Sequence, residues 1–280
     1  MSCSFKVFWE FKMKLMENKK GIIMGVANER SIAWGIANEL SKHGADLIFT
    51  YQNESLKKRI IPLAESVNSN ELYQCDVAEE PSKLNSIENF VSRLKSHSYK
   101  IDFIVHAVAF SDKEELKGKY IETSRKNFLQ TLDISTFSFT RIAKACLPII
   151  NPNGGSLLTL TYLGAKRTTP HYNVMGVAKA ALETSVKYMS MDLGPKNIRV
   201  NAISAGPMKT LAGAAISGAR HVFRFSEKVT PLKNNPDLEQ VGNAALYLLS
   251  DLSSGVSGVI HNVDGGLHSS GVPAQKDIDF

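Results

Sequence analysis

Short apolar segments alternate with longer amphipathic segments along most of the chain. The apolar segments are rich in aliphatic residues and have the length of strands that are buried on both faces. They lie at 21–26, 46–51, 72–75, 101–107, 155–162, 198–204 and 258–263. Alternation of strands and helices predicts a parallel sheet with helices against both faces. The sequence therefore predicts a single-domain α/β fold with a doubly wound parallel sheet of about seven strands.

Two of the intervening segments show helical patterns with recognisable ends. In 32–43, apolar residues recur on one helical face, namely Ile32, Ala33, Ile36, Ala37 and Leu40. We expect Ser31 to cap the start of this helix and Gly44 to end it in a left-handed conformation. A second helix is predicted from Tyr172 to Leu193, where Gly194 and Pro195 stop it.

The two ends of the chain fall outside this pattern. Residues 1–17 are predicted to be an N-terminal extension and residues 273–280 a C-terminal tail, around a domain that spans 18–272. The first sixteen residues mix aromatic with charged side chains, which interrupt the apolar core that a signal peptide needs. No apolar run approaches the roughly 18 residues of a membrane span. We therefore expect a cytoplasmic protein without membrane contact.

The charge distribution and the cysteine content argue against some classes of function for this chain. The chain has 33 basic and 27 acidic residues, a net charge of +6, but the basic residues are scattered apart from two short clusters. This distribution gives little support for nucleic-acid binding. It leaves open an acidic protein partner or an ordinary solvated surface. Three widely separated cysteines and dispersed histidines indicate a reducing compartment and no metal site.

The first strand runs through a glycine turn into the start of a helix. Backbone N–H groups between Gly25 and Ile32 form a potential site for an anion such as a cofactor diphosphate. Gly25 would permit close backbone approach, and Gly35 would let the helix sit near the sheet. The GxGxxG spacing is absent, so a purely structural turn fits equally well, but the position in the first βα unit favours a Rossmann-like dinucleotide site. The second strand ends at the neutral Gln52, which leaves NAD and NADP both open.

Tyr172 and Lys179 stand seven residues apart, about two turns, so they would share one face of the second helix. A phenol can donate a hydrogen bond to an oxygen that gains negative charge, and an ammonium group can stabilise that charge and hold cofactor hydroxyls. Tyr162 ends an apolar strand at the edge where α/β sheets bind ligands, so the three side chains are predicted to converge. The alternatives are a packed Tyr172 with a solvated Lys179, and a Tyr162 that bonds only to the backbone.

These residues belong to a longer pattern. Thr161-Tyr162-Leu163-Gly164-Ala165 precedes Tyr172-Asn173-Val174-Met175-Gly176-Val177-Ala178-Lys179-Ala180. Its Tyr-x6-Lys spacing replaces the Tyr-x3-Lys of most short-chain dehydrogenases, whose tyrosine position is held here by Met175. Further motifs are Phe49-Thr50-Tyr51-Gln52, Gln74-Cys75-Asp76-Val77, 199–207 with Thr210-Leu211-Ala212, and Val263-Asp264-Gly265-Gly266. Over about residues 19–268, the chain resembles the NADH-dependent enoyl-acyl-carrier-protein reductases of bacteria, a divergent branch of the short-chain dehydrogenase/reductase family.

This resemblance implies roles for individual residues. Tyr172 would bind a thioester carbonyl and stabilise the enolate, Lys179 would hold the nicotinamide ribose, and Tyr162 would line the substrate site among the active residues. The implied cofactor contacts are Gly25, Ser31 and Ile32 at the diphosphate, Gln52, Asp76 and Val77 at the adenosine, and Val108, Met208, Lys209, Thr210, Leu211 and Ala212 elsewhere. Ser111 would line the substrate pocket. The cofactor would be NADH, the substrate an enoyl group on acyl carrier protein in fatty-acid synthesis, and the assembly a homotetramer.

The sequence also departs from the family pattern. Ala109 stands where a glycine is frequent and Met208 where isoleucine is common, but neither change removes a catalytic group. Residues 207–225 are rich in alanine and glycine, which predicts a mobile substrate lid, with an ordinary packed helix as the alternative. The basic residues near its end could steer an acidic carrier protein; they are Arg220, Arg224, Lys228 and Lys233.

Two other interpretations remain. A carbonyl reductase, such as a 3-oxoacyl reductase, is expected to carry Tyr-x3-Lys with a serine on the fifth strand, where this chain has Met175 and Tyr162. A non-catalytic dinucleotide-binding regulator would not require both Tyr172 and Lys179. Fold alone does not choose among these functions.

Overall fold

The apolar segments form seven parallel strands in the computed structural model, which describes residues 14–78, 86–214 and 218–272. The strands are β1 (Lys20–Met24), β2 (Asp46–Tyr51), β3 (Leu72–Gln74), β4 (Phe103–His106), β5 (Gly155–Thr161), β6 (Ile198–Ala205) and β7 (Ile260–Val263). Every strand corresponds to one predicted segment. The predicted α/β class and the seven-stranded doubly wound sheet are therefore confirmed.

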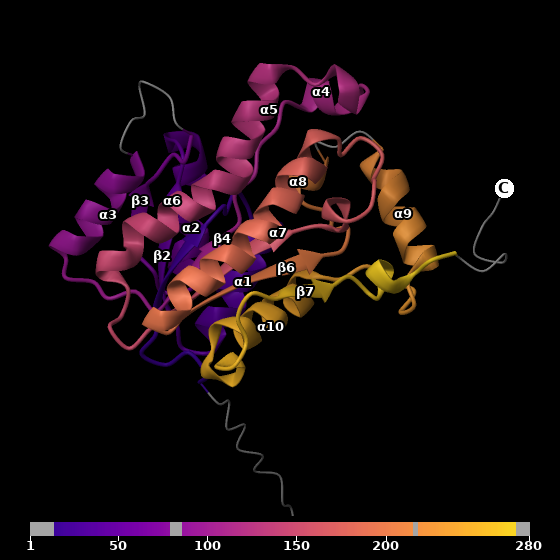
Figure 1. Cartoon of the computed structure of the whole chain (residues 1–280). Helices are drawn as coiled ribbons and strands as arrows, with labels where there is room; N and C mark the ends of the chain where they lie inside the picture. The colour runs from indigo at the N-terminus through magenta and orange to yellow at the C-terminus, as the bar shows by residue number, and fades with distance from the viewer. Residues whose placement is uncertain (1–13, 79–85, 215–217, 273–280) are drawn as a thin grey trace, which may run out of the picture.

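The strand order of the sheet is β3-β2-β1-β4-β5-β6-β7 (Figure 1). The chain builds outward from β1 to β3 and then returns to place β4 directly beside β1. The connections that follow β1 and β4 therefore leave in opposite directions, which opens a crevice at the carboxyl ends of these two strands. A ligand is expected in this crevice.

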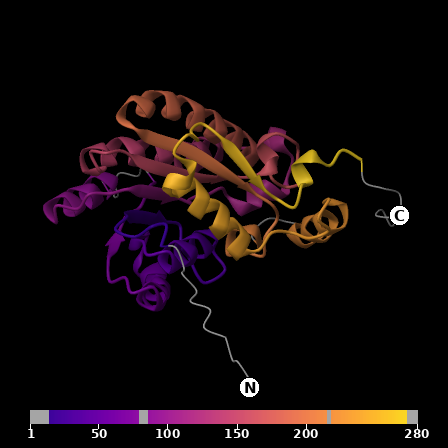
Figure 2. The same ribbon diagram turned by 90° about the horizontal axis from the view of Figure 1, so that it is seen from below.

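Helices cover both faces of the sheet (Figure 2). One face packs against α3, α6 and α7, and the other against α1, α2 and α10. The α-helices are α1 (Ile32–Lys42), α2 (Glu54–Ser66), α3 (Ser86–Ser96), α4 (Lys113–Lys117), α5 (Arg125–Leu132), α6 (Ser138–Cys146), α7 (Val174–Leu193), α8 (Leu211–Ala214), α9 (Ala219–Val229) and α10 (Leu238–Leu249). A π-helix, η3 (Asp133–Phe137), joins α5 to α6. The 3-10 helices are η2 (Tyr120–Glu122), η4 (Leu147–Ile149), η5 (Leu163–Ala165), η6 (Gly194–Lys196), η7 (Asp251–Ser253) and η8 (Leu267–Ser269).

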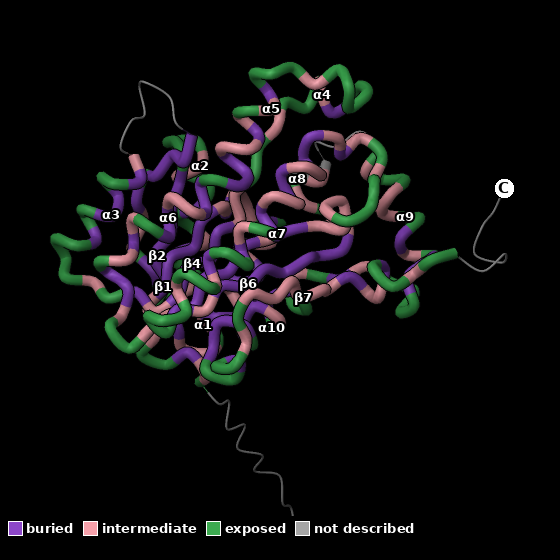
Figure 3. The backbone as a smooth tube through the Cα atoms, in the orientation of Figure 1, coloured by how far each residue is buried: buried purple, intermediate pink, exposed green. Residues whose placement is uncertain are grey.

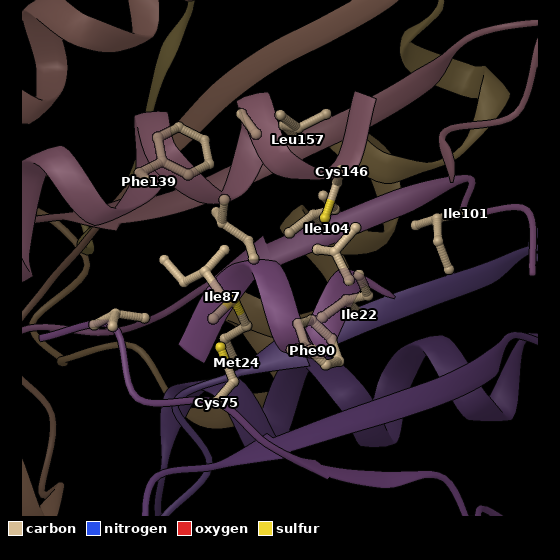
Figure 4. Packing of buried hydrophobic residues seen from close by; sticks show 14 of the residues in the cluster. Ile22, Met24, Cys75, Ile87, Phe90, Ile101, Ile104, Phe139, Cys146 and Leu157 are labelled. Atoms are coloured by element: carbon tan, nitrogen blue, oxygen red, sulfur yellow. The ribbon is translucent and has the colours of Figure 1, made fainter. Parts of the chain in front are cut away.

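Alternate residues of each strand face the two halves of the core. In β1, Ile22 and Met24 belong to one hydrophobic cluster and Ile23 to the other, and all three are at most 1% exposed. Figure 4 shows the first cluster, in which Phe90 of α3 and Phe139 of α6 lie against the sheet. Figure 3 shows that burial continues along the central strands. Burial on both faces explains why these strands read as continuous apolar runs.

The end of α1 agrees with the prediction, but its start has a different cause. Gly44 follows the helix with a left-handed φ of +91°, as expected. Ser31 precedes the helix, yet its hydroxyl does not cap it. The Ser31 hydroxyl instead accepts hydrogen bonds from the N–H groups of Ala27 and Asn28 at 3.0 and 3.1 Å. This side chain therefore fixes the turn before the helix.

α7 differs from its prediction at both ends. It begins at Val174 and not at Tyr172, because Asn173 has a φ of +42° that a right-handed helix does not allow. Gly194 keeps a helical conformation and begins a 3-10 turn, and the left-handed residue that follows is Asn197. Tyr172 thus lies on a turn and Lys179 on the helix, so the predicted shared helical face is wrong.

Gly35 was predicted to let α1 approach the sheet, but in the structure it contacts α10. A Cβ at Gly35 would lie 2.8 Å from Cβ of Leu238 in α10. A Cβ at Gly242 of α10 would lie 2.9 Å from the Gly35 carbonyl oxygen. The two glycines therefore let α1 and α10 cross in close contact, and Gly35 does not serve to bring α1 near the sheet.

The packed domain begins before the predicted boundary at residue 18. Met16 is fully buried in the cluster beneath α1 and α10, and its N–H donates to the His43 carbonyl at 2.9 Å. The end of the predicted extension is thus part of the domain. Residues 1–13 and the predicted tail 273–280 lie outside the described residues.

Candidate active site

A cavity of about 340 Å³ opens at the carboxyl ends of β1, β2, β3 and β4. Five residues predicted to bind a cofactor contribute to its wall, namely Gly25, Gln52, Asp76, Val77 and Val108. They come from four separate connections and meet because β4 returns to lie beside β1. The cavity therefore lies in the crevice that the strand order opens.

The turn after β1 lines the cavity and passes close to the chain after β4. Gly25 has a φ of +97°, and a Cβ there would overlap the Ala107 carbonyl oxygen of the chain after β4. The Ser31 hydroxyl holds the turn through Ala27 and Asn28, and Ile32 begins α1 and packs partly against the core. A glycine cradle followed by a helix N-terminus suits an anionic group such as a diphosphate.

Gln52 and Asp76 lie together at the far side of the cavity. Nε2 of Gln52 donates to Oδ2 of Asp76 at 3.1 Å, and Oδ1 of Asp76 accepts from the Ala78 N–H at 3.0 Å. Asp76 is 8% exposed. A neutral side chain after β2 is therefore held in a fixed orientation by a buried carboxylate.

Tyr162 and Tyr172 face each other beyond the end of β5. Their ring centroids are 5.1 Å apart with an interplanar angle of 66°. A Cβ at Gly164 would overlap the Tyr172 ring, so this glycine makes room for the ring. Burial raises the pKa of Tyr172 far above its ordinary value, and Tyr162 adds to the shift. Burial likewise raises the pKa of Tyr162, so both phenols keep their protons at neutral pH.

Lys179 of α7 reaches the end of the same strand. Its Nζ donates to the Leu160 carbonyl at 2.8 Å, and the residue is 6% exposed. Burial lowers the pKa of Lys179 to about 8, a shift that nearby Glu183 opposes. His106 of β4 is fully buried, and burial together with the Lys179 charge lowers the pKa of His106 to about 3. A charged ammonium group and two neutral phenols thus gather where β5 ends, beside a histidine that stays neutral.

The π-helix η3 connects the tyrosines with the cavity. The Ser135 hydroxyl accepts from the Phe110 N–H at 2.9 Å and lies 3.8 Å from the Met175 sulfur. Phe110 is part of the cavity wall, and Met175 packs in one cluster with Tyr172. Thr136 adds a hydrogen bond to the Ala178 carbonyl of α7 at 2.8 Å. Hydrogen bonds and packing through η3 therefore link the cavity wall to the tyrosine pair.

The sequence profile of the enoyl-(acyl-carrier-protein) reductase family matches residues 25–268, a range that includes all of the cavity wall except Met24 and all three catalytic candidates. The chain belongs to this family. Met175 then stands inside the Tyr-x6-Lys pattern as a packing residue, which agrees with its 7% exposure.

Known reductases are similar to this chain in sequence and structure over nearly its whole length. Enoyl-[acyl-carrier-protein] reductase [NADH] 1 of Rhizobium meliloti (strain 1021) is 54% identical over 260 residues, which cover 93% of this chain and 94% of that protein. The crystal structure of the Anaplasma phagocytophilum reductase in complex with NAD is 48% identical, with a TM-score of 0.88, over 95% of this chain and 98% of that one. FabI from Candidatus Liberibacter asiaticus is 50% identical, with a TM-score of 0.89, over 93% and 99%.

The reductase resemblance also implied cofactor contacts at 208–212, which the cavity wall does not include. The Lys209 ammonium lies 4.6 Å from the centre of the Phe223 ring in α9. Met208 packs partly against the core, and the Thr210 hydroxyl accepts from the Gly213 N–H at 2.9 Å. Leu211 begins α8 and is 53% exposed, and the Ala212 side chain lies outside the described part of the chain. The cofactor roles of these five residues stay predictions.

Ser111 is engaged in a polar network with α5. Its hydroxyl accepts from Nδ2 of Asn127 at 3.2 Å and from Oγ1 of Thr131 at 3.0 Å. Its substrate contact stays a prediction. Ala109, the departure from the reductase pattern, lies in the cavity wall itself.

The sequence pattern did not indicate some of the residues in the cavity wall. Gln130 and Ile134 line the cavity from α5 and η3, far along the chain from any strand end. Tyr51 and Leu56 also line it, and only their position around Gln52 after a strand could have indicated them.

The part of the chain that the structure describes contains no group of three His, Cys, Asp or Glu residues that could hold a metal ion. In the same ranges, every helix falls short of the length and apolar character needed to cross a membrane. Cys75 and Cys146 are buried free thiols, and burial raises the pKa of Cys75 to about 12.

Proposed function

We propose that this chain is an NADH-dependent enoyl-[acyl-carrier-protein] reductase that reduces trans-2-enoyl thioesters to saturated acyl thioesters during fatty-acid elongation. One observation carries the proposal: the partly buried phenol of Tyr162, the buried phenol of Tyr172 and the buried ammonium of Lys179 gather at the end of β5, and η3 links them to the cavity that Gly25 lines. Family membership over 25–268 supports the same reaction.

The cavity residues fit a dinucleotide, because the turn of Gly25 before a helix N-terminus and the polar pair Gln52 and Asp76 line the same cavity. NADH, when bound, supplies the hydride that goes to the β-carbon of the substrate. Tyr172 donates a hydrogen bond to the thioester oxygen as that oxygen gains enolate charge. Lys179 holds ribose hydroxyls and adds positive potential, and Tyr162 completes the wall of the substrate site. The Asp76 carboxylate beside Gln52 disfavours a 2′-phosphate, which supports NADH over NADPH.

The test follows loss of NADH absorbance with a crotonyl thioester and, separately, with an acetoacetyl thioester. We expect turnover of the crotonyl thioester only. Turnover of the acetoacetyl thioester alone would show a carbonyl reductase. Turnover of neither substrate, with NADH still bound, would show a non-catalytic regulator.

The catalytic efficiency should fall as the pH rises through about 8. Burial lowers the pKa of Lys179 to about 8 from the ordinary 10.5, so the free enzyme loses the ammonium charge in this range, and kcat/KM reports the free enzyme. The check is the pH profile of kcat/KM for wild type and Lys179→Arg, whose guanidinium stays charged to above about pH 12. The arginine variant should be slower but lack the inflection. An unchanged inflection in that variant would assign it to another group.

The free energy of unfolding, in contrast, should increase as the pH rises above about 8. The unfolded chain keeps the Lys179 proton up to its ordinary pKa of 10.5, whereas the folded protein releases it near 8. The unfolded state therefore binds more protons between these two values, and the cost of burying this group shrinks as the pH rises through that window.

We assign acyl carrier protein as the partner that presents the substrate, at a basic face of α9. Arg220, Arg224 and Lys228 are exposed and four residues apart, so they share one helical face, and Lys233 follows them. Arg220→Glu with Arg224→Glu should raise KM for carrier-bound substrate about three- to tenfold through lost attraction. KM for a small uncharged pantetheine thioester should not change. A matched charge reversal at Lys95 and Lys100, which are also exposed, should leave both values unchanged; equal effects of the two reversals would contradict this docking face.

We also propose a homotetramer in the cytoplasm, where NADH and the carrier protein are available. Support comes from apolar side chains exposed on neighbouring elements: Leu129 of α5, Phe137 of η3, and Tyr188 and Met191 of α7 are 48% to 78% exposed. Exposed apolar patches of this kind mark subunit contacts. Sedimentation equilibrium should give four times the chain mass, and a monomer mass at micromolar protein would exclude the assembly.

We retain the substrate lid as a proposal for 207–225, of which the structure describes 207–214 and 218–225. α8 spans only four residues, and Lys209, two residues before it, contacts the Phe223 ring of α9. Short helices with few buried side chains open easily. Hydrogen exchange in this segment should slow when NADH and an acyl thioester bind, and equal protection with and without ligands would exclude a lid.

A further inference from the structure

The turn that carries Tyr172 has an unusual backbone at the next residue. Asn173 has φ +42° and ψ −123°, and the Met175 N–H donates to the Tyr172 carbonyl at 2.9 Å. These values describe the first central residue of a type II′ turn, a position that normally requires glycine. An asparagine there is strained, so the surrounding structure must hold it.

Hydrogen bonds from the Asn173 side chain hold this backbone conformation in place. Its Nδ2 lies 2.9, 3.2 and 3.4 Å from the carbonyl oxygens of Gly118, Leu116 and Glu115. These carbonyls lie at the end of α4, where the helix has no further N–H groups to bond them. One amide group thus satisfies the end of α4 and ties the strained turn to it.

α4 is itself well anchored. The Glu115 carboxylate accepts hydrogen bonds from the N–H and the hydroxyl of Ser124, at 2.9 and 2.7 Å, at the start of α5. Leu116 is 5% exposed and packs in the same cluster as Tyr172 and Met175. The carbonyl groups that bind the Asn173 amide are therefore held in place by α4 and α5.

The Tyr172 ring is confined on its other sides by Gly164 and Tyr162. A turn that relaxed would move the phenol relative to these neighbours, and a shift of about 1 Å can cost about a hundredfold in rate. We propose that Asn173 is a positioning residue that acts through Tyr172: its amide locks the turn against α4 and so fixes where the phenol hydroxyl lies. This inference rests on the proposed function for its kinetic consequence.

Two variants separate the backbone role from the amide role. Asn173→Gly relieves the strained backbone but removes the amide, and Asn173→Asp keeps the shape but places an acceptor against three carbonyl oxygens. Matched controls are Asn197→Gly and Asn197→Asp. Asn197 also has a positive φ, of 56°, and its Nδ2 also donates to a carbonyl, that of Asn153 at 2.6 Å, but next to the start of β6.

We expect both Asn173 variants to lower kcat for the crotonyl thioester about 10- to 100-fold. NADH affinity should stay within about twofold of wild type, and the Asn197 variants should keep wild-type kcat. In the Tyr172→Phe background, Asn173→Gly should cost no further rate, because it acts only through the phenol. Losses that multiply in the double variant, or a wild-type kcat in Asn173→Gly, would overturn the inference. If Asn173→Asp fails to fold, Asn173→Gly alone decides.

A second readout does not depend on turnover. Ultraviolet difference titration follows the ionisation of tyrosine phenols, and Tyr172→Phe identifies the contribution of Tyr172. In Asn173→Gly the Tyr172 phenol should ionise at lower pH than in wild type, because a displaced ring regains contact with water. An unchanged titration would overturn the positioning role, whereas a shifted titration in a chain that reduces neither thioester would contradict only the proposed function.

Discussion

Tyr172→Phe should lower kcat for an enoyl thioester by about 10²–10³-fold, the usual cost of removing one donor to a developing oxyanion. The phenol is 7% exposed, and burial keeps it protonated at neutral pH, so wild type offers a neutral donor that needs no rearrangement. Phenylalanine keeps the ring and its contact with Tyr162 but not the hydroxyl. The measurement is steady-state kcat with a crotonyl thioester, together with NADH affinity, which should stay at its wild-type value.

Tyr247→Phe is a suitable control for this experiment. Tyr247 lies on α10 at 38% exposure, so it loses the same hydroxyl away from the cavity and the tyrosine pair. It should keep the wild-type kcat. A Tyr172→Phe enzyme that retained more than about a tenth of the wild-type rate would remove this phenol from the role of principal oxyanion donor.

Gly25→Ala should destabilise the fold by roughly 3 kcal/mol and abolish measurable NADH binding. The new Cβ would overlap the Ala107 carbonyl oxygen, and φ at this position is +97°, which alanine rarely adopts. The turn after β1 must therefore move either into the cavity or away from β4. Urea unfolding and fluorescence titration with NADH measure the two effects separately.

Gly194→Ala provides the matched control for Gly25→Ala. Gly194 has a helical φ of −53°, and a Cβ there would meet nothing within 4 Å. Alanine at such a position is neutral or stabilising by about 0.4–1 kcal/mol, through lost freedom in the unfolded chain. If both variants unfolded at the same urea concentration, the close approach at Gly25 would not limit stability.

The strands and their arrangement could be predicted because buried parallel strands leave a strong trace in the sequence. β1, β2 and β4 are composed mainly of aliphatic and aromatic residues, which pack in the two hydrophobic clusters of the core. Once the strands were placed, Gly25 and Gln52 followed from their positions after the first and second strands, whereas Asp76 was indicated only by the family resemblance. Their assignment to particular parts of a cofactor came from family resemblance and not from spacing.

The turns at Asn173 and Ser31 could not be predicted, because they depend on tertiary contacts. Asn173 carries no glycine-like signal, yet it holds a positive φ through an amide that reaches α4, more than fifty residues away in the chain. Ser31 looked like a helix cap, but the geometry of the Gly25 turn offers its hydroxyl two other N–H groups. Gly35 indicated close packing correctly, but a sequence does not say which neighbour comes close.

The contact between α1 and α10 can form only late in synthesis, so it limits when the domain can finish folding. Gly35 and Gly242 belong to the first and the last long helix of the domain and are separated by most of the chain. The turn before α1 therefore packs against a complete domain only after α10 has left the ribosome. Contacts so distant in sequence form slowly, so we expect the nascent chain to stay unable to hold a dinucleotide until its final helix emerges.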